Sequence, residues 1–561
     1  MEQSIINKIN EWSKFAVEDL DLVNEYQSIK NDEEKLYDAF YKELSFGTAG
    51  LRGVLGFGTN RMNIYVIRKA TQGVANYLLK EFKGKKLNVA ISYDSRIKSD
   101  IFAREAASVL ATNGIHVYLY KQLMPVPLLS FATRELKCDA GIMVTASHNP
   151  SKYNGYKVYG SDGCQITEVA ADKILKEIGK INPFEVKMET FEKLLINNLI
   201  EFISDDILDK FINIVRSQSV LGDAKVNKDV KIVYSPLNGA GLVPVTKILK
   251  ESGYSNITVV EEQRNPDGHF PTCPFPNPEV REAMELGISY AKKVDADLLI
   301  ATDPDCDRVG IAVKNGNDFT LLSGNQVGVL MLNYICELRT LNNTMPPKPF
   351  AVATIVSTDM VELIAKHYGV KMYRCLTGFK YIGSIIAAHE SAHEENNYIM
   401  GFEESYGYLT HTYARDKDAV NGAFMIAEMF AYYKTQGLSL IDKLNSLYKE
   451  FGFFLNKTDN FVFEGAAGFG KMKDIMASFR KGLSNVGGYN IVEELDYLKG
   501  INGLPKSDVL KYVLENGSTV VVRPSGTEPK LKMYCSIKAK DEKESLEIYN
   551  KIFADLGKKF K

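Results

Sequence analysis

Residues 140–150 read Ala-Gly-Ile-Met-Val-Thr-Ala-Ser-His-Asn-Pro. The apolar run predicts a buried strand over 140–146, and Pro150 stops that strand because proline cannot donate to a strand ladder. The turn is expected to leave the hydroxyl of Ser147 pointing outward at a sheet edge. Such a serine can simply cap a turn, or it can carry a phosphoryl group where the chain also supplies a divalent metal ion and cationic side chains.

Outward from this strand, short β-rich runs alternate with longer helical patterns, which favours an α/β fold. Strands are predicted over 87–93, 116–120, 230–234, 257–261, 297–301, 350–355 and 370–375, with helices over 101–112, 243–251, 327–338 and 423–433. The last part differs, because strands over 518–522 and 531–537 flank a turn and precede a helix over 542–556. This pattern predicts a smaller α+β unit.

The length of 561 residues predicts three to five domains, since a domain typically has about 100–200 residues. Residues 1–45 are charged and helix-like, with Trp12, Phe15, Leu20 and Leu22 as expected packing anchors. The predicted limits are 1–45 for this helical extension, 46–205 for domain 1, 206–322 for domain 2, 323–455 for domain 3, and 456–561 for a linker and domain 4.

Composition excludes several classes of protein. The formal net charge of −2, with 45% hydrophobic and 25% charged residues, gives no whole-chain attraction to nucleic acid or to an acidic membrane. The seven cysteines form no Cys-x-x-Cys pair, which argues against a zinc site and a disulfide framework. No signal peptide or membrane span is expected, and a reducing cytoplasm is the expected compartment.

Asp303, Asp305 and Asp307 alternate in a short segment after a predicted strand. Three carboxylates that converge on one loop are hard oxygen ligands suited to Mg²⁺. A calcium-binding EF-hand would have glycine and glutamate where Arg308 and Lys314 stand, so that site is disfavoured. A solvated acidic turn is one alternative; a phosphatase whose nucleophile is an aspartate is another, against which Ser147 argues.

Two further segments carry the components of phosphate sites. Residues 523–527, Arg-Pro-Ser-Gly-Thr, combine an arginine with two hydroxyls and backbone N–H groups, the parts of an anion-binding nest. Residues 47–53, Gly-Thr-Ala-Gly-Leu-Arg-Gly, place Arg52 in a loop whose glycines permit close approach to a ligand. A capped hairpin and a solvent-facing arginine are the alternatives.

Together and in this order, these motifs and Gly-Phe-Glu-Glu-Ser at 401–405 resemble the α-D-phosphohexomutase superfamily, in particular its long branch of phosphoglucomutases and phosphopentomutases. The resemblance spans nearly the whole chain beyond residue 45. It implies an intramolecular phosphotransferase with three similar α/β mixed-sheet domains and a C-terminal α+β domain, four domains around a central cleft.

The resemblance also implies catalytic and metal-binding roles. Ser147 would carry the phosphoryl group, with His148 beside it and Arg52 directed at the reacting phosphate. Lys157 would act as general base, because burial beside other cations would lower its pKa. Ser147, Asp303, Asp305 and Asp307 would hold Mg²⁺. The segment Tyr93–Arg96 would have a supporting role.

The remaining implied roles concern the substrate. Arg308 would steady the transferred phosphate, and Glu403 and Ser405 would accept and donate hydrogen bonds to sugar hydroxyls. Gly407 stands where some relatives have a histidine base, which excludes that base. The other implied substrate-binding residues are Thr377, Gly378, Lys380, Lys417, Arg523, Ser525, Gly526 and Thr527. The carry-over to Lys417 rests on Arg415–Asp418, where the spacing from Ser405 is one residue longer than in the family.

The implied reaction interconverts glucose 1-phosphate and glucose 6-phosphate through a phosphoserine and a sugar 1,6-bisphosphate, which also serves as activator. A phosphopentomutase acting on ribose or deoxyribose 1-phosphate is the alternative within the fold. A metal-dependent phosphatase and a non-catalytic phosphosugar sensor are alternatives from other classes. The expected partner is a small phosphosugar, with no nucleic acid and no membrane, and the expected state is a monomer or homodimer.

Overall fold

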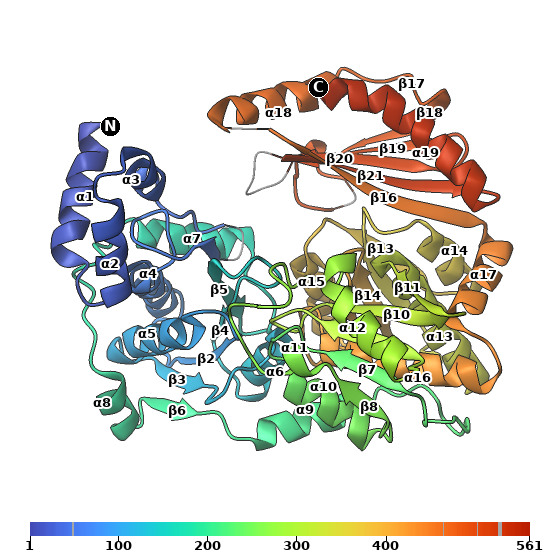
Figure 1. The fold of residues 1–561 in the computed structure, drawn as a ribbon, viewed down its shortest axis with the longest axis horizontal. Coiled ribbons are helices and arrows are strands. Elements are labelled where there is room, and N and C mark those ends of the chain that lie inside the picture. The colour runs from blue at the N-terminus through green and yellow to red at the C-terminus, as the bar shows by residue number, and fades with distance from the viewer. Residues whose placement is uncertain (48–49, 464, 502, 525–529, 561) are drawn as a thin grey trace. The chain divides into compact units, whose positions relative to one another are not determined.

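The computed structural model describes residues 1–47, 50–463, 465–501, 503–524 and 530–560. The chain separates into two compact units (Figure 1). Unit 1 comprises residues 1–219, 228–322 and 411–427, and unit 2 comprises residues 220–227, 323–410 and 428–561.

The amino-terminal segment of unit 1 is helical, as predicted. It contains α1 (Gln3–Phe15), α2 (Leu20–Ile29) and α3 (Glu33–Phe40). Trp12 and Leu22 are buried, and the Trp12 ring meets the rings of Phe40, Phe57, Tyr65 and Phe184 edge-on.

Two expected packing anchors of that segment are wrong. Leu20 is 73% exposed, because residues two apart on a helix point in nearly opposite directions and Leu22 takes the inward position. Phe15 ends α1 and is 47% exposed, with its ring beside that of Phe184.

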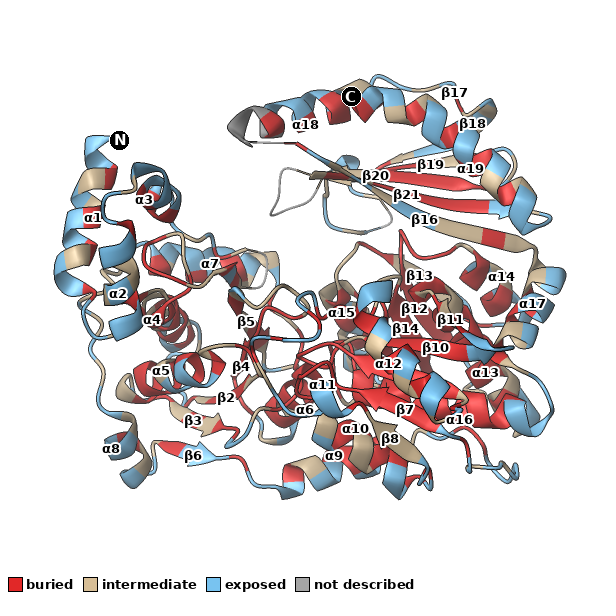
Figure 2. Ribbon diagram, in the orientation of Figure 1, coloured by how far each residue is buried: buried red, intermediate tan, exposed pale blue. Residues whose placement is uncertain are grey.

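The first sheet of unit 1 has the strand order β1-β5-β4-β2-β3-β6. Its strands are β1 (Gly50–Val54), β2 (Asn88–Tyr93), β3 (His116–Leu119), β4 (Ala140–Val144), β5 (Tyr153–Gly160) and β6 (Ile200–Phe202). The accompanying helices are α4 (Ile64–Glu81), α5 (Ser99–Thr112), α6 (Val126–Glu135), α7 (Glu168–Ile178), α8 (Phe191–Ile196) and α9 (Asp206–Arg216). Every residue of β4 is buried, as expected for the central apolar run (Figure 2).

The second sheet of unit 1 has the order β11-β10-β9-β7-β8. Its elements are β7 (Ile232–Ser235), α10 (Leu242–Glu251), β8 (Ile257–Val259), α11 (Glu261–Arg264), α12 (Arg281–Lys293), β9 (Leu298–Thr302), β10 (Val309–Asn315) and β11 (Asp318–Leu322). The strand predicted over 257–261 therefore ends early, because Glu261 begins α11.

Unit 2 contains a sheet with the order β13-β12-β14-β15. Its elements are α13 (Gly324–Leu341), β12 (Phe350–Thr354), α14 (Met360–His367), β13 (Lys371–Cys375), α15 (Phe379–Ser391), β14 (Tyr398–Glu403), β15 (Gly407–Leu409) and α17 (Leu440–Phe451). A 3₁₀ turn, η1 (Glu395–Asn397), precedes β14, and α16 (Ala419–Thr435) begins in unit 1 and ends in unit 2.

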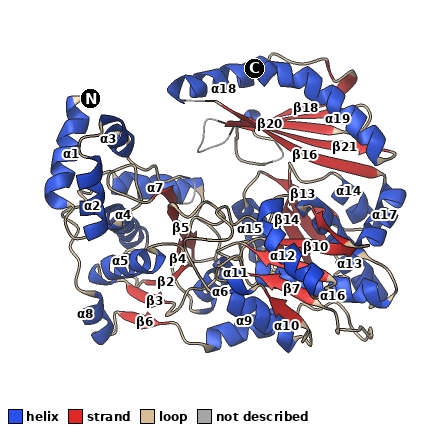
Figure 3. Cartoon of the chain, in the orientation of Figure 1, coloured by secondary structure: helices blue, strands red, loops and turns tan. Residues whose placement is uncertain are grey.

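The carboxyl-terminal part of unit 2 is an antiparallel sheet with the order β16-β21-β20-β19-β18-β17 (Figure 3). Its elements are β16 (Phe453–Val462), α18 (Gly465–Phe479), β17 (Asn485–Val486), β18 (Tyr489–Asp496), η2 (Tyr497–Lys499), β19 (Leu510–Leu514), β20 (Thr519–Pro524), β21 (Lys530–Ala539), α19 (Glu542–Leu556) and η3 (Gly557–Phe560). The helix predicted over 542–556 matches α19, and an apolar core joins α18 and α19 to the sheet. The predicted α+β character of this part is confirmed.

The first three sheets repeat one local topology that residue-level comparison of the sequence did not reveal. The orders β5-β4-β2-β3, β10-β9-β7-β8 and β15-β14-β12-β13 each place one antiparallel strand beside parallel strands. In each sheet, one short loop joins the antiparallel strand to its parallel neighbour. These loops contain Ser147, the Asp303–Asp307 run and Ser405, so the fold places the three motifs at equivalent positions.

Candidate active site

The loop after β4 holds Ser147 in an unusual backbone conformation. Its φ is +52°, in the left-handed region that residues other than glycine rarely occupy. The Ser147 N–H donates to Thr145 Oγ1 at 2.8 Å, and the Thr145 hydroxyl donates to Asp94 Oδ2 at 2.6 Å. These bonds stabilise the turn and fix the direction of the serine side chain.

Arg96 binds this loop from within the protein. It is only 3% exposed, and its Nη1 donates to the carbonyls of Pro150 and Tyr153 at 3.0 Å. Its Nη2 donates to the carbonyls of Ser147 and Asn149. One guanidinium therefore donates hydrogen bonds to four carbonyl groups in and beside the loop. Through these bonds the segment Tyr93–Arg96, for which a supporting role was expected, holds the loop in place.

The Ser147 side chain was expected to point outward, but it is buried. Ser147 is 4% exposed, and its Oγ donates to Asp303 Oδ2 at 2.8 Å. The expectation of an exposed hydroxyl is wrong because the loop after β9 packs over the loop after β4, an arrangement that neither local sequence encodes.

Asp303, Asp305 and Asp307 form a buried acid cluster. Their exposures are 0%, 0% and 1%, and one potential ligand atom from each lies within 4.8 Å of the others. Asp303 Oδ1 accepts the backbone N–H groups of Asp307 and Arg308 at 3.1 and 2.9 Å. The loop is thereby curled so that its three carboxylates converge, as the sequence predicted.

The acid cluster has the donor set of a divalent metal site. Oδ1 of Asp305 and Oδ1 of Asp307 are buried and have no hydrogen-bond partner among the described residues. Buried carboxylate oxygens are normally hydrogen-bonded, so such orphaned oxygens need an explanation. A hard cation such as Mg²⁺ fits these three carboxylates and the Ser147 oxygen beside them.

Two lysines face the acid cluster. Lys157 Nζ lies 2.9 Å from Asp305 Oδ2 and 3.7 Å from Asp307 Oδ2. Lys417 Nζ lies 3.1 Å from both Asp307 Oδ2 and Asp416 Oδ1. Lys157 lies in β5, which runs between β1 and β4, and it is the register partner of Met143 in β4. This position in the sheet brings its side chain to the acid cluster.

Burial and the close spacing of charged groups shift the pKa values of Lys157 and Asp303. Burial acts to lower the pKa of Lys157, but the carboxylates of Asp305 and Asp307 outweigh it, so the pKa is raised. The expected lowering is therefore wrong: the nearest charges are anions. Burial and the neighbouring carboxylates raise the pKa of Asp303 well above its usual range.

His148 contacts Ser147, and Arg52 contacts the loop that holds it. His148 Nδ1 is 3.2 Å from Ser147 Oγ, and burial together with Arg308 and Arg52 lowers the pKa of His148 well below its ordinary value. The imidazole is therefore neutral near pH 7. Arg52, in β1, donates to Asn149 Oδ1 at 3.1 Å, and Arg308 pairs with Glu279.

Unit 2 brings together two of the predicted sugar-binding loops. Glu403 ends β14 and is 5% exposed, and its Oε1 accepts the Gly378 N–H at 2.8 Å. Thr377 precedes this glycine, Lys380 lies in the first turn of α15, and Ser405 is half-buried in the loop between β14 and β15. The Gly401–Ser405 and Thr377–Lys380 segments therefore form one surface.

Of the four residues predicted to bind the non-transferring phosphate, the structure describes Arg523. Arg523 lies in β20, with its guanidinium carbon 6.0 Å from the centre of the Tyr534 ring. Ser525, Gly526 and Thr527 lie outside the described residues.

Three contributions to the site were not anticipated. Asp416 accepts hydrogen bonds from Tyr159 and Gln165 at 2.8 and 2.9 Å, which fixes the partner of Lys417. The Phe270 ring lies 5.2 Å from the Arg96 guanidinium carbon, and the Phe275 ring meets His148 edge-on. Both phenylalanines lie in the proline-rich segment 265–278, whose composition does not indicate these contacts.

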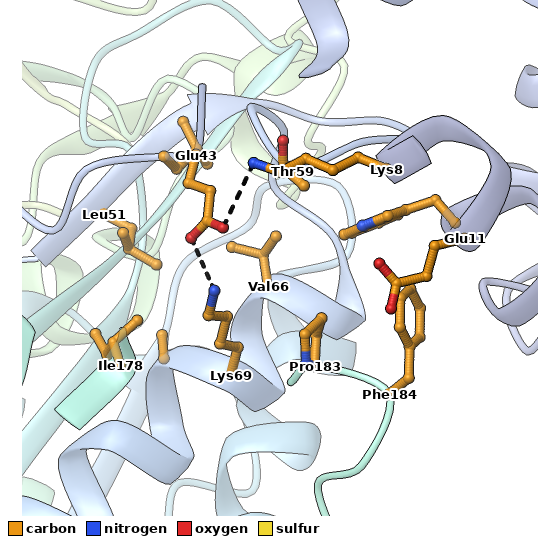
Figure 4. A pocket seen from close by; sticks show the side chains of 13 residues that line it. Lys8, Glu11, Glu43, Leu51, Thr59, Val66, Lys69, Ile178, Pro183 and Phe184 are labelled. Atoms are coloured by element: carbon orange, nitrogen blue, oxygen red, sulfur yellow. Dashed lines mark hydrogen bonds and ion pairs between the residues drawn. The ribbon is translucent and has the colours of Figure 1, made fainter. Parts of the chain in front are cut away.

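A separate cavity of about 90 Å³ lies between α1 and α4, with Leu51 of β1 and Ile178 of α7 also lining it (Figure 4). Its lining includes Trp12, Val66 and Phe184, and Lys69 pairs with Glu43 at 2.8 Å near its edge. None of the residues predicted for the active site lines it, so the chemistry of the chain lies elsewhere.

Comparison with protein families gives one consistent result along the chain. Models of the phosphoglucomutase/phosphomannomutase family match residues 43–184 (alpha/beta/alpha domain I), 209–316 (domain II), 323–451 (domain III) and 473–550 (C-terminal domain).

Individual relatives agree with this result. A phosphoglucomutase of Staphylococcus saprophyticus is 35% identical over 535 residues, covering 93% of this chain and 95% of the relative. A phosphoglucomutase of Staphylococcus haemolyticus is 35% identical over 531 residues, covering 92% and 94%. Among solved structures, a putative phosphomannomutase from Thermus thermophilus has a TM-score of 0.68 at 20% identity, covering 92% of this chain and 99% of that one. That likeness concerns the fold.

Proposed function

This chain belongs to the phosphoglucomutase/phosphomannomutase family, and on that basis we propose that it interconverts glucose 1-phosphate and glucose 6-phosphate through a phosphoserine at Ser147. The observation that carries the proposal is the 2.8 Å hydrogen bond from Ser147 Oγ to Asp303 in the buried acid cluster. A serine hydroxyl beside a divalent metal site and two lysines has what phosphoryl transfer needs.

In the proposed reaction, the bond between Ser147 Oγ and phosphorus breaks while phosphorus bonds to the free hydroxyl oxygen of the sugar monophosphate. The Ser147 oxygen released from phosphorus takes up the proton that this hydroxyl loses, so a serine hydroxyl and a glucose 1,6-bisphosphate result. In the second half, the other phosphorus–sugar oxygen bond breaks and phosphorus returns to Ser147. Glucose 1,6-bisphosphate would therefore also load the serine of an unphosphorylated enzyme, as an activator.

The residues around Ser147 would have two roles: some position the loop, and others stabilise the charge of the phosphoryl group. Arg96 and Asp94 fix the loop, and Arg52 and His148 flank the hydroxyl. We assign Lys157 to stabilising the charge of the transferring group, because its Nζ lies within ion-pair distance of the acid cluster beside Ser147. Mg²⁺ held by Ser147 and the acid cluster would neutralise negative charge on the phosphoryl group.

Substrate recognition would come from the remaining predicted residues. Glu403, Ser405, Thr377, Gly378 and Lys380 would contact the sugar. The non-transferring phosphate would bind Arg523, Ser525, Gly526 and Thr527. Arg308 would contact the transferring phosphate, and Lys417 would contact substrate beside the acid cluster. These residues fall in the proposed domains 46–205, 206–322, 323–455 and 456–561, each of which would supply at least one of them.

The test is a pair of initial-rate measurements with Mg²⁺ and glucose 1,6-bisphosphate, using glucose 1-phosphate and ribose 1-phosphate as substrates. We expect the larger kcat/KM for glucose 1-phosphate. We expect Ser147→Ala to lower kcat by at least about 10⁴-fold, as loss of a nucleophile does, and to abolish phosphorylation seen by intact mass. Ser151→Ala, in the same turn, is the matched control and should keep activity.

Other outcomes assign other functions. A larger kcat/KM for ribose 1-phosphate would make the chain a phosphopentomutase. Release of inorganic phosphate by Ser147→Ala would make an aspartate the nucleophile of a phosphatase. Substrate binding without turnover in the wild type would indicate a phosphosugar sensor.

A further inference from the structure

The turn that carries Arg96 is tied at its outer end to the amino-terminal helices. Residues 94–99 connect β2 to α5, and Lys98 is the residue before the first turn of α5. Lys98 has a φ of +64° and makes no side-chain capping bond to the helix. A lysine in the left-handed region is uncommon, so something outside the helix must stabilise this conformation.

The partners of Lys98 are two aspartates of the segment Glu18–Asp21, here called the acidic turn. Lys98 Nζ lies 2.6 Å from Asp19 Oδ2 and 2.9 Å from Asp21 Oδ2. The Lys98 and Asp19 side chains are 16% and 13% exposed, so this pair is largely shielded from solvent. Asp19 is itself fixed, because its Oδ1 accepts the Asp21 N–H at the start of α2.

The acidic turn is in turn anchored to the helices around the first sheet. Glu18 accepts two hydrogen bonds from Arg68 at 2.9 and 2.8 Å, and its N–H donates to the Tyr65 hydroxyl at 3.0 Å. Arg68 also pairs with Glu105 of α5 at 2.5 Å. The acidic turn that binds Lys98 is therefore itself held by hydrogen bonds and an ion pair to residues of α4, and through Arg68 to α5.

From Lys98 the connection to the phosphoserine loop is short. Asn154 Nδ2 donates to the Ile97 carbonyl and to Ser99 Oγ, both at 3.0 Å. The Ser99 hydroxyl donates to Asp94 Oδ1 at 2.8 Å, and Asp94 also accepts from Thr145. The residues on either side of Lys98 thus contact the end of the Ser147 loop at Asn154 directly, and Ser99 reaches the other end, at Thr145, through Asp94.

We propose that Lys98, held by Asp19 and Asp21 of the acidic turn, is a positioning residue that sets Arg96 and the phosphoserine loop for phosphoryl transfer. This assigns a function to the amino-terminal helices, which contribute none of the residues assigned to the reaction. The inference rests on the proposed function of Ser147. A displaced loop would misplace the serine oxygen, and misplacement by about 1 Å can cost about 10²-fold in rate.

The kinetic test compares Lys98→Met, Asp19→Asn and the double variant with the wild type, well below their melting temperatures. We expect each single variant to lower kcat about tenfold with KM changed less than twofold, and the double variant to be no worse than Lys98→Met. Lys98→Arg should recover most of kcat. Lys98→Gly accepts the left-handed backbone without strain but loses the ion pairs, so it should be as slow as Lys98→Met.

Asp38→Asn is the matched control. Asp38 also lies on an amino-terminal helix and pairs with a basic residue of the α/β part, Arg61 at 2.6 Å, but it does not contact residues 94–99. It should leave kcat unchanged. Unchanged kcat in Lys98→Met, with only a lower melting temperature, would overturn the proposal, as would a normal rate for Lys98→Gly.

A second readout does not need the mutase reaction. Backbone amides of residues 145–153 should exchange with deuterium several-fold faster in Lys98→Met than in the wild type or in Asp38→Asn. Equal exchange in all three proteins would overturn the proposal. A wild type without mutase activity would refute the proposed function while this readout still decides whether Lys98 orders the loop.

Discussion

The acid cluster and the acidic turn each contain three carboxylates within five residues, yet they occupy opposite environments. In the acid cluster, Asp303, Asp305 and Asp307 are at most 1% exposed, and two of their oxygens accept no hydrogen bond from the described residues. In the acidic turn, side-chain exposure is 57% for Glu18 and 77% for Asp21, and both side chains pair with basic side chains.

The difference shows which acidic groups can hold a metal ion. Exposed carboxylates that face lysine or arginine are already neutralised and gain little from a cation. In the acid cluster, three buried carboxylates crowd one another and face two lysines, so they repel one another and gain from a divalent ion that binds all three. Burial together with oxygens that accept no hydrogen bond, rather than acidic composition, distinguishes the acid cluster as the candidate metal site.

Among substitutions in these two acidic regions, Asp303→Asn should have the largest effect. The asparagine oxygen can still accept the two backbone N–H groups, but one metal ligand loses its charge. We expect kcat to fall on the order of 10²–10³-fold, the loss typical of removing a preorganised electrostatic group. Stability of the metal-free protein should not fall, because two carboxylates of the cluster then face two lysines. A large loss of metal-free stability would contradict this account.

The next largest difference between the two regions should be in their effect on stabilisation by Mg²⁺. Mg²⁺ at about 100 times its Kd should stabilise the wild type by about 2.7 kcal/mol in thermal unfolding, and EDTA should reverse this. The Mg²⁺-dependent shift should disappear in Asp303→Asn and persist in Asp19→Asn. An equal shift in all three would place the metal outside the acid cluster.

The pH dependence of metal-free stability should differ as well. The folded-state pKa of Asp303 is raised, so its contribution to stability is fully present below the unfolded pKa and is lost as pH rises through the folded value. The wild type should therefore lose stability relative to Asp303→Asn between pH 4 and pH 7 in EDTA. Denaturant titrations at several pH values measure this; a constant difference would argue against charge repulsion in the cluster.

The smallest effect belongs to the exposed member of the acidic turn. Asp21→Asn should change the free energy of unfolding by less than about 0.5 kcal/mol, as exposed ion pairs do, and should leave most of kcat. Asp19→Asn, on the shielded side, should give the larger kinetic effect. If Asp21→Asn slowed the reaction more than Asp19→Asn, the assignment of the main partner of Lys98 would be wrong.

Much of this site could be predicted from local sequence. The apolar run 140–144 and the polar turn after it predicted β4 and its loop, and the alternation of Asp303, Asp305 and Asp307 predicted converging carboxylates. Such features depend on side-chain period and on turn chemistry, which neighbouring residues control. The pKa shift of Lys157 was misjudged because its environment depends on Asp305 and Asp307, which are distant in sequence.

The sequence by itself determined the α/β class, the order of the motifs and the helix over 542–556, because periodicity and turn residues act over a few positions. Only the tertiary structure decided that Ser147 Oγ meets Asp303, 156 residues away, and that Lys157 faces carboxylates instead of cations. It also decided that Lys98 meets Asp19 across 79 residues. Burial and long-range charge pairing are properties of packed elements, so they become defined only when those elements come together.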